Sequence, residues 1–314
     1  MKKFNANLNI KGILANPQED WNRIKRAAQG NVRVAFRKLD VDWKKYTTDN
    51  YLFTHDTIVC SVETEPNHYW IKKPCEELVN ANGNAWSNEV LLGCFKTFVG
   101  GENFLEHVQQ PSLSKGKILD AIIRPVVHHS EKYGDAHIYM VDILVATNRK
   151  HADLVHRIES GKLSTMSMGC LADKVQCSIC GKIIGDGERE CEHLERHLGK
   201  QVVCEDGETR ICAELCGCLD KDGNFEEGSC EFIEASWVDN PAFPGAVLNE
   251  FVETPEIKEA RESEERDLAH LFDGNLFERL KVADKESNLA IKVVKKFARI
   301  DRIAQKVACT RENK

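Results

Sequence analysis

The chain has 314 residues, of which 42% are hydrophobic, and its formal net charge is −7. This hydrophobic fraction is enough for a packed core, so disorder along the whole chain is excluded. No apolar run approaches the about 18–20 residues of a membrane-spanning helix, and the start lacks the apolar stretch of a secretory signal. We therefore expect no membrane partner, and we expect the 13 cysteines to be thiols or metal ligands rather than disulfides.

Residues 1–45 are basic and contain one predicted helix. They hold 11 Lys and Arg against four Asp and Glu. Asn16 suits the N-cap of a helix, Pro17 suits its first position and Gly30 its end. We expect a basic helical N-terminal arm, which either docks on an acidic partner or packs on its own domain.

Residues 46–250 carry the predicted strands and form the predicted main domain. Runs rich in β-branched and aromatic residues predict strands at 51–62, 115–125, 136–147, 163–169 and 231–238. Between the third and fourth strands, Asn148 and Gly161 enclose a short amphipathic helix. Many strands with few helices predict an α+β fold, mainly an antiparallel β-barrel with flanking helices.

Nine of the 13 cysteines fall between residues 170 and 230. Four metal-ligand residues within this stretch have the spacing of a zinc knuckle: Cys177, Cys180, Cys191 and His193. Three thiolates and one imidazole suit a tetrahedral, structural Zn²⁺, which has no open position for chemistry. His197, one helical turn further, is an alternative fourth ligand. We expect a zinc-binding insertion at 171–230.

Five further cysteines of this insertion are candidates for a second metal site, although their spacing is less regular: Cys204, Cys212, Cys216, Cys218 and Cys230. A nucleic-acid-binding zinc finger is the rival interpretation of the knuckle. Acidic residues outnumber basic ones between 170 and 230, which argues against contact with phosphates. We therefore expect no nucleic-acid partner.

Residues 251–314 form a charged tail that is predicted to be helical. It has seven acids against three bases at 253–267, and eight bases against two acids at 291–314. Between Val293 and Val307, apolar residues recur at alternating spacings of four and three. This seam suits either a partner helix, including that of a second copy, or the body of the protein.

Three segments of the main domain carry a histidine, a serine and a carboxylate in chain order. They contain His107, Ser167 and Glu234. Hydrolysis by a serine needs these three groups, as a nucleophile, a base that takes its proton and a group that orients the base.

The order and the amino-acid sequences of these segments resemble those of the prohead (capsid maturation) proteases of tailed phages. This family is distantly similar to the herpesvirus assemblin serine proteases. His107 precedes the strand Gly116 to Ala121, Ser167-Met168-Gly169 follows a helix, and the last strand runs from Glu234 to Ala242. The similarity spans about 95–245, and it extends to members that insert a Cys-rich knuckle directly after the serine strand.

This resemblance implies an assemblin-like barrel and a serine endopeptidase. Ser167 would be the nucleophile, His107 the general base and Glu234 the third member, with backbone N–H groups near Met168 and Gly169 as the oxyanion hole. Asp120 is a second candidate for the third member. Ser164 is a rival nucleophile, which on one strand with Ser167 would face the opposite side.

The resemblance also implies partners and a location. The enzyme would cleave scaffold and capsid proteins of the same phage, and its own terminal segments, inside a procapsid in the host cytoplasm. The alternative is a catalytically inactive, structural virion protein that keeps the protease-like fold and a structural zinc site.

Overall fold

A computed structural model describes residues 2–5, 45–65 and 69–252 of the chain. These residues belong to the first of two compact units, Met1–Thr254, and the second unit, Pro255–Lys314, lies outside the described residues. The predicted helix at 16–30 and the predicted helical seam of the tail also lie outside them.

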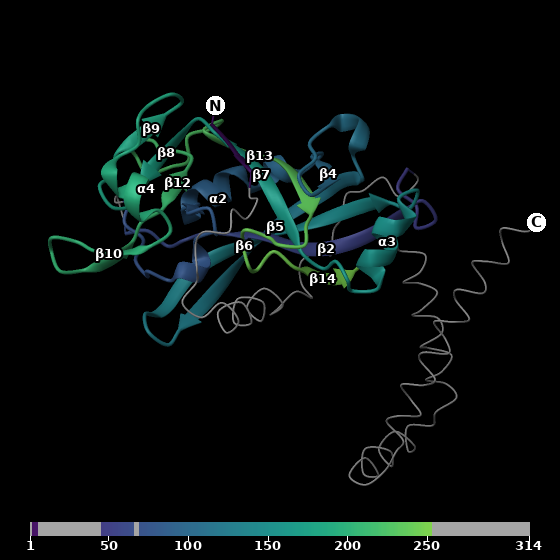
Figure 1. Ribbon diagram of the computed structural model, residues 1–314, viewed down its shortest axis with the longest axis horizontal. Coiled ribbons are helices and arrows are strands. Elements are labelled where there is room, and N and C mark those ends of the chain that lie inside the picture. Colours follow the sequence, from purple (N-terminus) through teal and green to yellow (C-terminus); the bar gives the residue numbers. More distant parts are fainter. Residues whose placement is uncertain (1, 6–44, 66–68, 253–314) are drawn as a thin grey trace, which may run out of the picture. The chain divides into compact units, whose positions relative to one another are not determined.

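An eight-stranded sheet forms the body of the described part (Figure 1). Its strands, in spatial order, are β1 (Lys2–Asn5), β7 (Met166–Ala172), β13 (Cys230–Trp237), β4 (Glu102–Leu105), β5 (Gly116–Ser130), β6 (Gly134–Asn148), β2 (Tyr51–Cys60) and β14 (Leu248–Phe251). All neighbours are antiparallel except β13 and β4, which are parallel.

The fold class is α+β, but the predicted closed barrel is not confirmed. Within the described residues, β1 and β14 are the two edges of the sheet and do not pair with each other. The segments before β7 and β14 meet only at the isolated bridge between Thr165 and Val247. A single bridge is not a continuous ladder of paired residues, so the sheet is not closed into a barrel at this point.

The five predicted strands are present as β2, β5, β6, β7 and β13, with shifted ends. Strand β5 runs five residues further than predicted, to Ser130. Strand β7 begins three residues later than predicted, at Met166, because Thr165 bonds instead with the chain at Val238 and Val247. Ser164 therefore precedes the strand. The expectation that Ser164 and Ser167 share one strand is wrong.

The predicted helix between β6 and β7 is α3 (Ala152–Glu159), whose buried face is Leu154, Val155 and Ile158. Its N-cap is His151 and not Asn148, because Asn148 still belongs to β6. The chain leaves the helix through Gly161, which has a left-handed φ of 71°.

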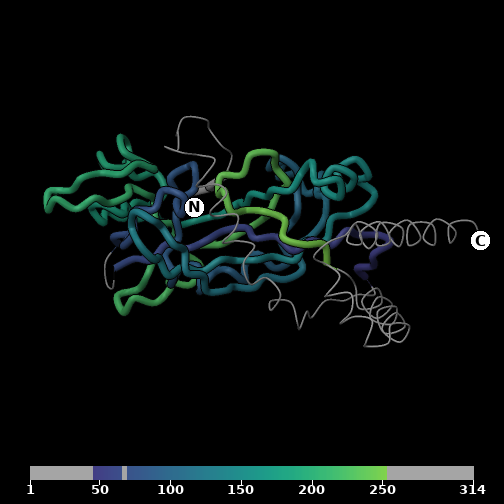
Figure 2. Tube along the Cα trace, turned by 90° about the horizontal axis from the view of Figure 1, so that it is seen from below, coloured from purple at the N-terminus to yellow at the C-terminus, as the bar shows by residue number. Residues whose placement is uncertain are grey.

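A second, smaller region comes mainly from the Cys-rich insertion. Its four-stranded sheet has the order β3 (Asn84–Ala85), β12 (Glu214–Cys216), β8 (Lys174–Cys177) and β9 (Ile183–Gly185). The hairpin of β10 (Gln201–Val203) and β11 (Thr209–Ile211) and the short helix α4 (Glu192–His197) complete it. Figures 1 and 2 show these elements gathered at one end of the main sheet.

The insertion is not an independent module, because it shares strands and core with the main domain. Strand β12 pairs in parallel with β3 of the main domain, and the paired residues Glu214 and Asn84 are 130 positions apart in the chain. The Trp70 Nε1–H donates to the Ile179 carbonyl at 3.3 Å, and Gly181 lies directly against the Tyr69 ring, where a Cβ would come within 2.1 Å.

The remaining helices are short. Helix α2 (Asn88–Cys94) begins at Ser87, whose Oγ accepts the Val90 N–H at 3.3 Å, and it buries Val90, Leu91 and Cys94. Three single 3₁₀ turns are η2 (Glu76–Leu78), η3 (Phe95–Phe98) and η4 (Pro111–Leu113). Over the ranges that the structure describes, no helix has the length and apolarity to cross a membrane.

A β-bulge in β13 sets which of its side chains enter the core. The register with β7 shifts between Phe232 and Glu234, so Ile233 is the extra residue. Because of this one-residue insertion, Phe232 and Ala235 both reach the core, where Phe232 stacks on Phe98 at 4.3 Å between ring centroids. Glu234 consequently faces the opposite side of the sheet.

Candidate functional site

The structure joins His107 and Glu234 directly. His107 Nδ1 lies 2.7 Å from Glu234 Oε1, and both side chains are only 1% exposed. His107 Nε2 is buried and has no hydrogen-bond partner among the described atoms. A carboxylate on Nδ1 fixes the tautomer in which Nε2 carries the lone pair, which is the arrangement of a general base.

A strained turn after β4 brings His107 to this position. Glu106 and His107 have φ values of 50° and 55°, and within the described residues no other non-glycine residue has a positive φ. Each such residue costs of order 1–3 kcal/mol, so the surroundings must stabilise the turn. The Glu106 N–H donates to the Trp237 carbonyl at 2.9 Å, which fixes the turn to the end of β13.

Ser167 lies on the same face of the sheet as this pair. In the β7–β13 ladder, Ser167 is directly opposite Ser236, and Gly169 is directly opposite Glu234. Residues opposite each other in an antiparallel pair point to the same side, with Cβ atoms about 4.5–5.5 Å apart. Ser167 is 2% exposed. No hydrogen bond joins it to His107 Nε2 in this structure.

Two further side chains hold the Glu234 carboxylate. Gln109 Nε2 donates to Oε1 at 3.1 Å, and the Ser236 hydroxyl donates to Oε2 at 2.6 Å. Gly169 provides the space for this network, since a Cβ there would lie 2.7 Å from Glu234 Oε1. The carboxylate is therefore held in one orientation, with an oxygen towards the imidazole.

The other two candidates lie elsewhere. Asp120 accepts from Lys96 Nζ at 3.1 Å and from the Ala121 N–H, whereas the partner of His107 is Glu234. The Ser164 carbonyl accepts the Leu248 N–H, in the segment before β7. The structure thus groups His107 and Glu234 with Ser167 on one face, and it gives Asp120 a different partner.

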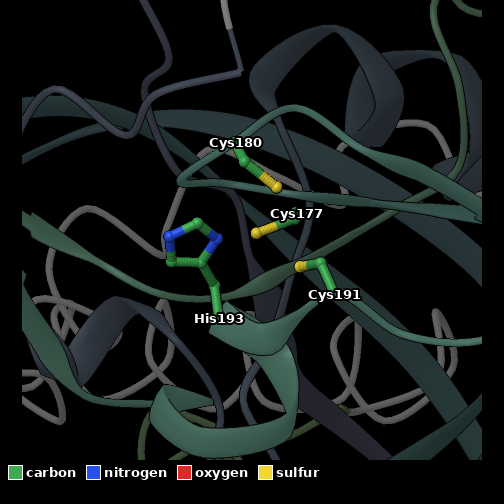
Figure 3. Close-up of side chains that lie close together, drawn as sticks. All are labelled: Cys177, Cys180, Cys191 and His193. Carbon is green, nitrogen blue, oxygen red and sulfur yellow. The ribbon is translucent and has the colours of Figure 1, made fainter.

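The four knuckle residues also come together (Figure 3). One ligand atom from each of Cys177, Cys180, Cys191 and His193 lies within 4.8 Å of the other three, so the group could hold a metal ion. Cys177 ends β8, Cys180 lies in the turn to β9, Cys191 is the N-cap of α4 and His193 lies in its first turn.

The cluster has the features expected of a metal site. His193 Nδ1 is buried without a hydrogen-bond partner among the described atoms, and Figure 3 shows the ring beside the three sulfurs. The Ile179 N–H points at Cys177 Sγ at 3.4 Å, and the Gly181 N–H closes the turn on the Cys177 carbonyl at 2.9 Å. His197 is exposed and is not in the group.

Without a cation beside them, the Cys177 and Cys191 thiols of the cluster are held in the neutral form. Burial raises the pKa of the Cys191 thiol to about 11, and a hydrogen bond with Cys212, together with burial, raises the pKa of Cys177. Thiolates at such a site need a positive charge beside them, and a bound divalent metal supplies it.

The five cysteines considered for a second metal site do not form one. Cys216 and Cys230 are buried in the core, where Cys230 Sγ lies 3.4 Å from Cys170 Sγ. Cys212 contacts the knuckle through the His193 carbonyl, while Cys204 lies beside the β10–β11 hairpin. Among the described residues, no metal-ligand group combines these five cysteines.

Sequence reasoning missed Gln109 and Ser236 as partners of Glu234. Each is two residues from a predicted site residue, and for Ser236 the alternation of a strand was a usable signal. For Gln109 no such signal existed, because the left-handed turn at Glu106 and His107 is not encoded by a glycine.

Comparison with known protein families, with curated proteins and with solved structures finds no match to this chain.

Proposed function

We propose that the chain is a serine endopeptidase in which Ser167 is the nucleophile, His107 the general base and Glu234 the residue that orients the base. The observation that carries the proposal is the buried 2.7 Å contact between His107 Nδ1 and Glu234 Oε1, on the sheet face that also bears Ser167. The segment resemblance gives the substrate class, which is scaffold and capsid proteins of a tailed phage.

The chemistry follows from this arrangement. His107 Nε2 takes the proton of the Ser167 hydroxyl while Oγ attacks the carbonyl carbon of a peptide bond. Glu234 holds Nδ1–H and stabilises the imidazolium that forms. The imidazolium then gives its proton to the leaving amine, and water, activated by the same base, hydrolyses the acyl-enzyme.

The knuckle has a structural role in this proposal. Four protein ligands complete the tetrahedral shell of Zn²⁺, so the ion would stiffen the insertion and take no part in peptide hydrolysis. Zinc is the proposed ion because three thiolates and one imidazole are its usual structural ligands.

One observation favours the second candidate, an inactive structural virion protein. Ser167 is 2% exposed and His107 Nε2 makes no hydrogen bond to it. A peptide can reach Ser167 only after the residues that cover it move. In an inactive protein the same network would simply stabilise the fold, and the capsid proteins would remain full length.

The two candidates are separated by co-expression with the scaffold and capsid proteins of the same phage. We expect the wild-type chain to shorten these proteins or its own ends, and Ser167→Ala to abolish the shortening because no other group can form the acyl-enzyme. The lengths of these proteins in the assembled particles are measured by electrophoresis and mass spectrometry.

Ser164→Ala is the matched control, since Ser164 is three residues away and outside the site. It should process like the wild type. Unchanged processing by Ser167→Ala would exclude Ser167 as the nucleophile.

A further inference from the structure

A second group of metal-ligand side chains lies in the body of the protein, outside both sites described above. It consists of Cys75, Glu77 and His128, whose ligand atoms all lie within 4.8 Å of one another. Their exposed fractions are 1%, 7% and 1%. His128 Nε2 is 2.9 Å from Glu77 Oε1.

The donor types suit a borderline divalent cation. A thiolate, a carboxylate and an imidazole are each common zinc ligands, with bonds of about 2.0–2.3 Å, so tetrahedral donors lie roughly 3.3–3.8 Å apart. The three donors lie within 4.8 Å of one another, and the 2.9 Å contact between His128 and Glu77 would widen by about half an ångström around a bound ion. Three protein ligands leave one position for water or a further donor.

A metal also explains why these groups are buried together. An ion pair taken out of water costs several kcal/mol per ion unless further interactions compensate it. A divalent cation bound to all three donors supplies such compensation.

The group connects two parts of the fold. Cys75 and Glu77 lie on segment 69–78, and His128 lies on β5 of the main sheet. The insertion contacts the same segment twice. The Trp70 indole bonds to Ile179 of the knuckle, and Gln201 Nε2 of β10 donates to the Pro74 carbonyl at 3.0 Å.

We propose that Cys75, Glu77 and His128 form a second metal site, which binds a zinc-class divalent cation. The bound ion fastens segment 69–78, the platform on which the insertion docks, to strand β5. This proposal does not depend on the proposed protease activity.

The test counts metal ions on the full-length protein. The chain is expressed with zinc, separated from loosely bound metal by gel filtration, and analysed by native mass spectrometry and elemental analysis. We expect about two zinc ions per wild-type chain, and about one after His128→Asn. His129→Asn is the matched control, because neighbouring residues on a strand face opposite sides and His129 is exposed. It should keep about two.

Glu77→Gln provides a variant that is expected to fold. The amide can still hydrogen-bond to His128, but it loses the charged ligand, so the second ion should be lost or bound at least tenfold more weakly. Cys177→Ser with Cys180→Ser should remove the other ion and leave this one. A wild-type chain with a single zinc that disappears with the knuckle cysteines would overturn the proposal. So would a wild-type count retained in both His128→Asn and Glu77→Gln.

Discussion

At Gly169, the absence of a side chain allows the site network to form. A Cβ there would lie 2.7 Å from Glu234 Oε1 and 3.0 Å from Gln109 Nε2. Gly169 is two residues from Ser167 on the same face of β7, so the strand itself places the proposed nucleophile near the Glu234 carboxylate. This gives a steric reason for the glycine in the segment Ser167-Met168-Gly169.

Gly169→Ala should therefore impair activity without unfolding the protein. The methyl group displaces the Glu234 carboxylate from His107, and loss of an oriented base costs about 10²–10⁴-fold in rate. Peptidase assays beside thermal unfolding measure the two effects. Gly185→Ala is the control, because its Cβ would meet nothing closer than 3.7 Å. Full activity of Gly169→Ala would show that the Glu234 position is not required.

The buried Asp56 carboxyl group predicts how the stability of the fold depends on pH. Complete burial raises its pKa from 3.8 to about 7, although a hydrogen bond from Thr54 at 2.7 Å opposes the shift. Between these two values the folded chain keeps a proton that the unfolded chain releases, so stability falls as pH rises through this window.

Asp56→Asn cannot titrate and should lack this loss. Its melting temperature relative to the wild type should therefore increase between about pH 4 and about pH 7, as measured by calorimetry. Asp222→Asn, at an exposed position, should show no such trend. A pH-independent difference between Asp56→Asn and the wild type would mean that Asp56 titrates normally.

At the scale of the elements, the knuckle turn, α4 and β12 depend on one another. Ser178 Oγ donates to the Ile211 carbonyl and accepts the Ala213 N–H, both at 2.7 Å, which links the turn to the strand that pairs with β3. A metal at the knuckle would therefore stabilise part of the main domain as well as its own loop.

Removing the metal should lower the melting temperature of the whole described unit. A ligand at a hundred times its Kd contributes about 2.7 kcal/mol, and each kcal/mol shifts the melting temperature by about 2–4 °C for this size. We expect a decrease of roughly 5–10 °C after chelation, and a smaller decrease when Cys177→Ser is treated with the chelator, because only an ion at Cys75, Glu77 and His128 is then left to remove.

Cys204→Ser is the control for this experiment. Cys204 is outside the ligand group, so this variant should bind metal and respond to the chelator as the wild type does. An unaltered metal content in Cys177→Ser would contradict the assignment of the knuckle.

What could be predicted from sequence depended on how local each signal was. The knuckle ligands lie close together in the chain, and strands β2, β5, β6 and β13 have strong β-branched patterns, so both were found. Short elements whose pairing is long-range were missed, such as β1 on β7 and β3 on β12. The predicted barrel closure is not confirmed within the described residues, and closure likewise depends on long-range contact, between two edge strands.

The candidate site divides in the same way. His107, Ser167 and Glu234 were selected through a family resemblance and not from spacing alone. The bulge at Ile233, which turns Glu234 to the side of Ser167, has no sequence signature. The second proposed metal site was missed because His128 is far from Cys75 and Glu77 in the sequence. Only the fold of segment 69–78 brings Cys75 and Glu77 to His128 on β5.

We propose that the protein as a whole combines a main sheet, which carries the hydrolytic groups, with an insertion between two strands of this sheet, which a bound metal ion stabilises. Strand β7, which carries Ser167, and strand β13, which carries Glu234, lie at the two ends of the insertion in the sequence, and they pair directly with each other. The length of the insertion therefore does not affect the distance between Ser167 and Glu234. We expect the insertion to influence the proposed activity only through the stability of the fold.

The central claim is that Ser167 is a nucleophile activated by His107. It is tested by incubating the full-length chain with a fluorophosphonate and locating the adduct by intact mass and peptide mapping. We predict one adduct, on Ser167, which is absent in Ser167→Ala and forms on the order of a hundredfold more slowly in His107→Ala. A folded wild-type chain that remains unlabelled at Ser167, or that labels equally fast without His107, would contradict it.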